Sequence, residues 1–233
     1  MLVAPDVADV AGPRIRIAPV TGLPLLHITE PRVDSLARQV VSAGTRLLAI
    51  PLTLILSPVL LLVALAVLID SGRPLFYRQE RIGHREKPFQ ILKFRTMVAD
   101  ADEQLTQIIH LNEHDGALFK IRDDPRVTRI GKWLRKFSLD ELPQLFNVLK
   151  GEMVFVGPRP VLEREMSQFG EAEQRRFLTK PGMTGLWQVS GRTDIPWEDA
   201  VKLDLYYVEN WSPLLDLLIM CRTIRIVLAG TGA

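Results

Sequence analysis

The chain has 233 residues, 47% of them hydrophobic, and a formal net charge of +2 at pH 7. So small a net charge excludes bulk electrostatic attraction to an acidic partner, and we expect no nucleic-acid partner. The single cysteine, Cys221, excludes an internal disulfide and fits a reducing compartment.

Residues 1–33 are expected to form a proline-rich lead-in. They contain five prolines and short runs of strand-forming residues such as "RIRIAPV". A segment of this length is too short to bury a core of its own. We interpret it either as strand and loop ahead of the main domain or as the remnant of an upstream domain. The first ten residues lack the basic stretch and apolar run of a signal peptide, so none is expected.

The next region, residues 34–72, carries a long apolar segment. Residues 47–69 contain no charged side chain. A straight helix of this length spans about 34 Å, enough for a hydrocarbon core of about 30 Å. A single membrane crossing is therefore the first interpretation.

Two observations favour instead a helix that enters the membrane and turns back. Ser57 and Pro58 lie near the middle, where proline removes a backbone hydrogen bond and the serine hydroxyl can bind the groups set free. Basic residues on both sides of the segment disfavour moving either side across a membrane. They are Arg32, Arg38, Arg46, Arg73, Arg78, Arg81, Arg85 and Lys87. A kinked crossing and a buried core helix are the alternatives.

Residues 73–233 are expected to form the main domain. Strand-forming residues predict two strands in 74–97, joined by a turn near Gly83–Lys87. Helices are predicted at 98–114, from Asp140 onward and at 161–178, and glycines and a proline predict a loop over 180–192. Two helices follow in 198–230, separated at Ser212–Pro213, and the second is amphipathic.

Two adjacent carboxylates, Asp140 and Glu141, begin a helical run in "RKFSLDELPQL". Because proline is accepted in the first turn of a helix, Pro143 predicts that Asp140 is the N-cap. A helix prefers acids at these positions, so a purely structural role accounts for the pair. Alternatively, a helix N-terminus attracts phosphate, and a nearby cation such as Arg135 would keep a carboxylate ionised as a nucleophile.

Basic residues recur in short motifs that suit phosphate contacts. Lys93 and Arg95 share "KFR", Arg159 lies in "GPRP" and Arg192 lies in "SGR". Glycine or proline stiffens the loops of Arg159 and Arg192, which favours preorganised bidentate contacts. Taken singly, each arginine is more simply explained as a solvated charge.

Seven motifs occur in this order: "SPVLLLVALAV", "FYRQERIG", "KPFQILKFRTM", "DPRVTRIGKWLRKFSLDELPQLFNVLKGEM", "VGPRP", "KPGMTGLWQVSGR" and "LDLYYVENWSPLLDLLI". In this order they closely resemble the bacterial sugar transferase family, the monotopic phosphoglycosyl transferases that begin exopolysaccharide and glycan assembly. The resemblance covers about residues 38–228 and is most specific over 124–160.

The resemblance implies an α/β, mostly α, membrane-associated fold. Its parts would be a re-entrant membrane helix that turns at Ser57–Pro58, a compact catalytic domain with a small sheet, and interfacial amphipathic helices near the C-terminus. The implied reaction transfers a sugar 1-phosphate from a UDP-sugar to a polyprenyl phosphate of the undecaprenyl type, and it releases UMP.

The resemblance also implies roles for the site residues. Asp140 would be the nucleophile that forms a covalent aspartyl phosphosugar, with Glu141 as its catalytic partner. Mg²⁺ would be the cofactor, held by Asp140 and Glu141. The matching phosphate-binding arginines are Arg135, Arg159 and Arg192, and Lys93 and Arg95 are further candidates.

The implied partners are a UDP-sugar, polyprenyl phosphate and membrane lipid, at the cytoplasmic face of the inner membrane. The sugar, the polyprenol length and a homodimer are left open. The alternative function is a membrane-anchored protein that binds prenyl phosphates or anionic lipids without turnover. The acid pair favours the enzyme, because a pure anion binder gains nothing from two carboxylates beside its arginines.

Overall fold

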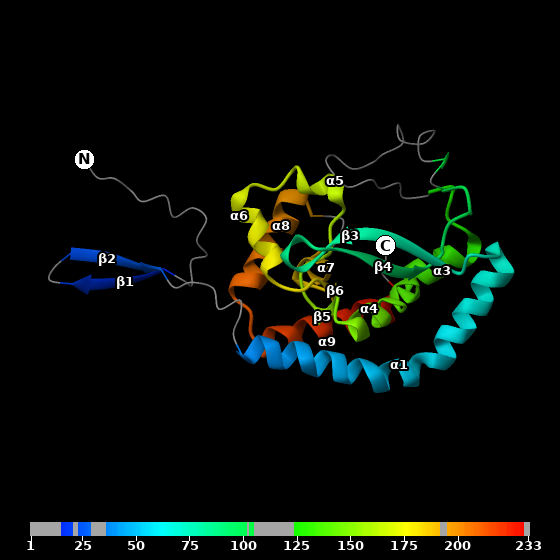
Figure 1. The fold of residues 1–233 in the computed structure, drawn as a ribbon, viewed down its shortest axis with the longest axis horizontal. Helices are drawn as coiled ribbons and strands as arrows, with labels where there is room; N and C mark the ends of the chain where they lie inside the picture. The colour runs from blue at the N-terminus through cyan, green and yellow to red at the C-terminus, as the bar shows by residue number, and fades with distance from the viewer. Residues whose placement is uncertain are drawn as a thin grey trace.

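The computed structural model describes residues 15–20, 23–28, 36–101, 103–104, 124–191 and 195–230. Helices dominate these residues, which also form three two-stranded sheets (Figure 1). Within the lead-in, β1 (Ile15–Val20) and β2 (Leu23–Ile28) pair antiparallel. The division into residues 1–33, 34–72 and 73–233 stays a prediction.

Helix α1 (Leu36–Ser71) runs without interruption through two prolines and bends near its middle (Figure 1). Pro58 has no N–H for the carbonyl oxygen of Leu54, and the Ser57 hydroxyl donates to that oxygen at 2.7 Å. The expected compensation by serine is therefore present, within a continuous helix. The helix is long and apolar enough to serve as a membrane anchor.

Both halves of α1 pack against the rest of the chain. Ala49, in the first half, is fully buried with Val148 and Met153, and Val67, in the second half, is buried with Phe94 and Leu134. Most other large apolar side chains of α1 are exposed. They are Leu36, Val40, Leu47, Leu48, Ile50, Leu52, Leu54, Ile55, Leu61, Leu62, Leu65, Leu68 and Ile69. This exposure rules out the buried core helix, because a core helix would have covered these side chains.

Strands β3 (Phe76–Ile82) and β4 (Pro88–Phe94) form an antiparallel hairpin in which Gln79 faces Ile91. The short 3₁₀ helix η2 (His84–Glu86) connects them, and Arg85 adopts a positive φ of 55° there. The two strands and the turn predicted from the sequence are confirmed.

The middle of the chain folds as α3 (Arg129–Lys136), the 3₁₀ turn η4 (Leu139–Glu141) and α4 (Gln144–Lys150). The prediction that Asp140 is the N-cap of a helix is therefore wrong. Ser138, with a positive φ of 53°, redirects the chain, and residues 139–141 form a tight turn before α4 begins. Of the helix predicted at 98–114, the structure describes residues 98–101, 103 and 104, and residues 101, 103 and 104 are helical.

Two predictions for the region after α4 are wrong. The single polar helix expected at 161–178 is three pieces, α5 (Glu163–Met166), α6 (Glu171–Gln174) and the 3₁₀ helix η5 (Arg175–Leu178). The loop expected at 180–192 contains β6 (Gly182–Thr184), which pairs in parallel with β5 (Val154–Val156), and helix α7 (Leu186–Ser190). Its glycines permit close strand packing, since a Cβ on Gly182 would lie 2.7 Å from the Gly157 Cα.

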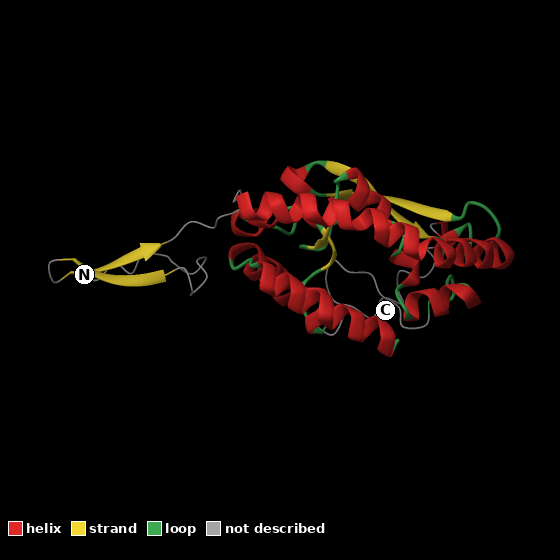
Figure 2. Ribbon diagram, turned by 90° about the horizontal axis from the view of Figure 1, so that it is seen from below, coloured by secondary structure: helices red, strands yellow, loops and turns green. Residues whose placement is uncertain are grey.

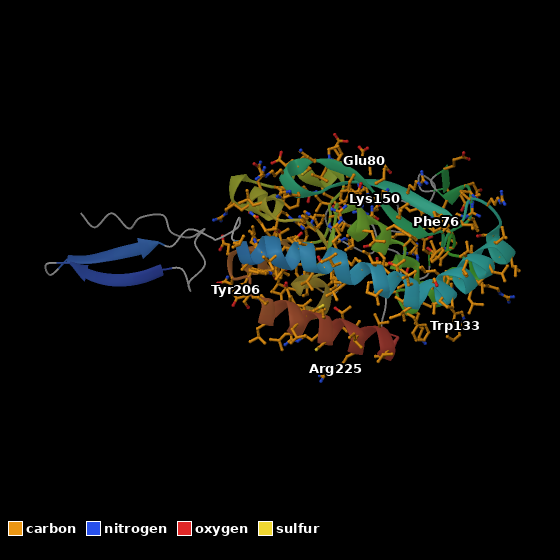
Figure 3. All side chains as sticks on the ribbon, turned by 60° about the horizontal axis from the view of Figure 1, so that its bottom comes forward. Phe76, Glu80, Trp133, Lys150, Tyr206 and Arg225 are labelled. Carbon is orange, nitrogen blue, oxygen red and sulfur yellow. The ribbon has the colours of Figure 1, made fainter. Side chains whose placement is uncertain are left out.

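The chain ends in α8 (Trp197–Glu209) and α9 (Pro213–Ala229), with the predicted break between them. The Ser212 hydroxyl caps α9 by accepting a hydrogen bond from the Leu215 N–H at 3.2 Å. Helices form the side of the molecule seen from below (Figure 2). α9 and α1 both lie on this side, together with Trp133 and Arg225 (Figure 3).

α9 presents apolar side chains to the outside. They are Leu214, Leu217, Leu218, Ile224 and Leu228, the last 77% exposed. Asp216, by contrast, is buried, and it accepts hydrogen bonds from the Tyr207 hydroxyl at 2.7 Å and from the Trp211 indole at 3.0 Å. This carboxylate is therefore part of the packing between α8 and α9, whereas Arg222 and Arg225 are exposed.

Candidate active site

A cleft of about 680 Å³ lies beside the β3–β4 hairpin. Its walls come from both strands, from η4 and from the segments 159–165 and 182–188. The cleft brings together most of the predicted site residues, namely Lys93, Arg95, Arg135, Asp140, Glu141 and Arg159. Ser57 and Pro58 lie within α1, and Arg192 lies outside the described residues.

Asp140 occupies a buried position in η4 and is only 8% exposed. Burial raises the pKa of its carboxyl from 3.8 to about 6. The positive charges of Lys93 and Arg135 oppose this increase, and the negative charge of Glu141 adds to it. Near pH 7.5 the carboxyl is therefore mostly ionised, and it is a stronger base than an exposed aspartate.

Glu141 forms an ion pair with Lys93 of β4, whose Nζ lies 2.6 Å from the glutamate Oε1. The same lysine lowers the pKa of Asp140. One cation therefore pairs with Glu141 and also favours the ionised form of the neighbouring, buried Asp140.

Arg135 comes from the last turn of α3, and its Nε donates to the Thr96 hydroxyl at 2.9 Å. Burial lowers the pKa of Arg135, while the negative charges of Asp140 and Asp124 raise it. Asp124 also lines the cleft and forms an ion pair with Arg126, at 2.6 Å between Oδ2 and Nη2. The charge of Arg135 is therefore stabilised by two acidic residues of the cleft wall, Asp140 and Asp124.

Arg159 follows β5, and its guanidinium lies over the Trp187 ring, 5.1 Å from the ring centroid. Its backbone N–H donates to Asp204 Oδ2 at 3.3 Å, and its carbonyl oxygen accepts from Arg176 Nη2 at 3.0 Å. Backbone and side chain are therefore both held, and Arg159 is among the residues that line the cleft.

Arg95 is engaged in a different way from the prediction. Its guanidinium donates to the backbone carbonyl oxygens at the end of α1, those of Ser71, Gly72 at 2.9 Å and Arg73 at 3.1 Å. These bonds give Arg95 a structural contact with the chain that leaves α1. A role in binding phosphate stays a prediction for this residue.

Three residues that line the cleft were missed as site candidates: Gln144, Arg81 and Arg164. Gln144 is 2% exposed, and its place four residues after Asp140, on the same side of a helical run, could have identified it. Burial and the positive charge of Arg159 lower the pKa of Arg81 to about 10. The period of two along β3 could have assigned Arg81 to an inward face.

The acid pair is also the candidate magnesium site. In the part of the chain that the structure describes, no three His, Cys, Asp or Glu side chains converge. Mg²⁺ is usually held by one or two carboxylates together with substrate phosphates and water. The oxygen donors of Asp140 and Glu141 therefore fit an ion that binds together with a diphosphate, and they do not form a complete cage by themselves.

Comparisons with known proteins cover most of the chain. The family model described as bacterial sugar transferase matches residues 37–230. The exopolysaccharide production protein ExoY of Sinorhizobium fredii is 45% identical over 191 residues, which are 80% of this chain and 84% of that protein.

Two longer relatives match over the same part of the chain. The UDP-galactose-lipid carrier transferase of Erwinia amylovora is 45% identical over 189 residues, 79% of this chain and 39% of that protein. The undecaprenyl-phosphate galactose phosphotransferase of Salmonella typhimurium is 41% identical over 192 residues, 79% of this chain and 40% of that protein. The chain therefore spans less than half the length of these two relatives.

Proposed function

Because the chain belongs to the bacterial sugar transferase family, we propose that it is a phosphoglycosyl transferase that acts at a membrane. It transfers a sugar 1-phosphate from a UDP-sugar to an undecaprenyl-type phosphate and releases UMP. The observation that carries the proposal is the buried Asp140 beside the half-buried Glu141, in a cleft that Arg135 and Arg159 also line. The names of the Erwinia and Salmonella relatives support the donor and acceptor classes.

In the first step, an Asp140 carboxylate oxygen attacks the phosphorus nearest the sugar. A bond forms between that oxygen and the phosphorus, the bond from phosphorus to the bridging diphosphate oxygen breaks, and UMP leaves. An aspartyl phosphosugar remains. The raised pKa of Asp140, about 6, supports this role, because the carboxyl is ionised near neutral pH and more basic than usual.

In the second step, a phosphate oxygen of the prenyl phosphate attacks the same phosphorus. The bond from phosphorus to Asp140 breaks, the carboxylate is restored, and the product is a prenyl diphosphosugar. Splitting one displacement into two in this way lets a single site serve both substrates.

The cations of the cleft would stabilise the charge that develops during both displacements. Arg135 and Arg159 line the cleft, and Arg159 is held by its backbone and its ring contact. Lys93 is paired with Glu141, and its charge favours the ionised form of Asp140. Mg²⁺, bound by Asp140 and Glu141, would neutralise the diphosphate of the donor.

For the membrane arrangement, we infer that α1 enters the cytoplasmic leaflet of the inner membrane and returns. Near its start, Arg46 donates to the Leu149 carbonyl oxygen at 2.6 Å and Arg38 donates to that of Val208 at 3.2 Å. At its other end, Arg95 binds the carbonyl of Gly72. Contacts of both ends with the same domain support this inference, since a straight crossing would separate them by the full bilayer.

The outer face of α9 supports an interfacial position for this helix. Its exposed leucines would lie among the acyl chains, and Arg222 and Arg225 would reach the headgroups. Trp133, 62% exposed on the same side of the molecule (Figure 3), is the kind of residue that prefers the membrane interface.

The direct test is UMP release by the purified full chain in detergent. The protein is incubated with undecaprenyl phosphate, Mg²⁺ and a panel of UDP-sugars that carry glucose, galactose or N-acetylated amino sugars. We expect turnover with at least one donor, and without acceptor a burst of at most one UMP per protein molecule. Binding of prenyl phosphate with no UMP from any donor would support the non-catalytic alternative instead.

A further inference from the structure

A buried ion pair joins η5 to α8 behind the cleft wall. Arg176 Nη2 lies 2.6 Å from Asp204 Oδ2, and the two residues are 3% and 2% exposed. Neither residue is among those that line the cleft. A pair of charges so deeply buried is a weak source of stability, because its desolvation offsets much of its attraction. The other hydrogen bonds of Arg176 and Asp204 therefore indicate a role for the pair besides stability.

The ion pair holds both main-chain polar groups of Arg159. Asp204 Oδ2 accepts a hydrogen bond from the Arg159 N–H at 3.3 Å. Arg176 Nη2 donates to the Arg159 carbonyl oxygen at 3.0 Å. Pro158 and Pro160 flank the arginine and restrict the backbone on both sides. Together these constraints fix the direction in which the Arg159 side chain leaves the backbone.

The far end of the side chain is held as well. The guanidinium of Arg159 lies over the ring of Trp187, itself 3% exposed, and Arg159 is one of the residues that line the cleft. A guanidinium held at its base and at its head loses little freedom when it binds an anion, which favours affinity.

We propose that Asp204 and Arg176 are positioning residues that hold Arg159 ready for the diphosphate of the UDP-sugar. This inference rests on the proposed function. Neither residue touches substrate, and their effect on binding passes through Arg159 alone. Asp204 therefore matters for nucleotide affinity only as long as Arg159 carries its guanidinium.

The test is a double-mutant cycle on UDP affinity, measured by calorimetry in detergent with Mg²⁺ present. UDP is the probe because it carries the diphosphate without the reacting sugar. Asp204→Asn and Arg159→Ala should each weaken binding about tenfold. Added to Arg159→Ala, the Asp204→Asn change should weaken binding by less than about twofold further.

A matched control separates positioning from general destabilisation. Glu209 is another buried carboxylate of α8, and it forms an ion pair with Arg175 at 3.0 Å. Glu209→Gln breaks this second ion pair and should leave UDP affinity unchanged, and the thermal midpoint of each variant shows how far stability alone has moved. If Asp204→Asn does not fold, the neutral pair Asp204→Asn with Arg176→Gln takes its place in the cycle.

Two results would overturn the inference. One is an Asp204 effect that is as large in the Arg159→Ala background as in the wild type, or that is absent in both. The other is a wild-type protein with no measurable UDP affinity. Wild-type protein that binds UDP but releases no UMP would contradict the proposed function alone, and the cycle would still decide the role of Asp204.

Discussion

Replacing Asp140 with asparagine should abolish UMP release and, at the same time, make the protein more stable. The amide has nearly the shape of the carboxyl, but it neither ionises nor acts as a nucleophile. In the folded protein, burial raises the pKa of Asp140 from 3.8 to about 6. Between these pH values the folded state binds more protons than the unfolded state. The free energy of unfolding of the wild type therefore falls as the pH rises through this window.

The size of the effect follows from the pKa. An increase from 3.8 to about 6 corresponds to about 3 kcal/mol of unfolding free energy, fully lost above pH 6. Asp140→Asn removes this penalty. Near pH 7.5 the thermal midpoint of the variant should exceed that of the wild type by about 6–12 °C for a chain of this size. The difference should vanish below about pH 4.

A second buried aspartate of the same cleft provides the control. Burial raises the pKa of Asp124, but the hydrogen bonds from Arg126 outweigh burial and hold that pKa below 3.8. Its carboxylate therefore stabilises the folded state above pH 3.8, and this contribution is lost as the pH falls through the folded pKa. Asp124→Asn should accordingly lower the thermal midpoint near pH 7.5.

Thermal unfolding in detergent at several pH values, combined with the UMP assay, tests both halves of the prediction. A midpoint for Asp140→Asn at or below that of the wild type near pH 7.5 would refute the argument from burial. UMP release at the wild-type rate would refute the assignment of Asp140 as nucleophile.

Three further predictions concern the membrane and Arg95. On a Cys221→Ser background, cysteines in place of Leu36 and Gly72 should react with an impermeant thiol reagent in lysates only, because the proposed arrangement places both ends of α1 in the cytoplasm. Labelling of position 36 in intact cells would mean that α1 crosses. An alkylation tag after Ala233 should stay on the cytoplasmic side, and its detection outside would contradict an interfacial α9. Arg95→Ala should lower the free energy of unfolding by about 1–3 kcal/mol through lost bonds to backbone carbonyls, with little change in KM for the UDP-sugar. A large rise in KM without destabilisation would instead support direct phosphate binding.

Local signals were sufficient for some elements and misleading for others. The turn at Gly83–Lys87 and the Ser212–Pro213 break were readable, because each depends on a few neighbouring residues. The helix predicted at 161–178 failed for a tertiary reason. Phe169 and Phe177 meet with ring centroids 5.9 Å apart, whereas eight residues of continuous helix would separate them by about 12 Å along the axis. The core required the chain to turn between them.

The candidate site shows the same division. The motif around Asp140 and Glu141 stood out in the sequence, and so did the nearby Arg135. The sequence could not show which basic residue binds backbone carbonyls. Arg95 does so, and its partners lie more than twenty residues earlier in the chain. The raised pKa of Asp140 was equally hidden, since its burial arises from packing between η4 and β4.

The two contact points of α1 bear on how the protein is made. Ala49 leaves the ribosome about one hundred residues before Met153, its partner in the core. At about 5–20 residues per second, α1 therefore waits about 5–20 s for the segment that covers this face. In the proposed membrane arrangement, the domain therefore completes its core against a helix that is already in lipid. A fragment that begins after Ser71, made to obtain a soluble enzyme, would lack the α1 side chains that complete its hydrophobic core.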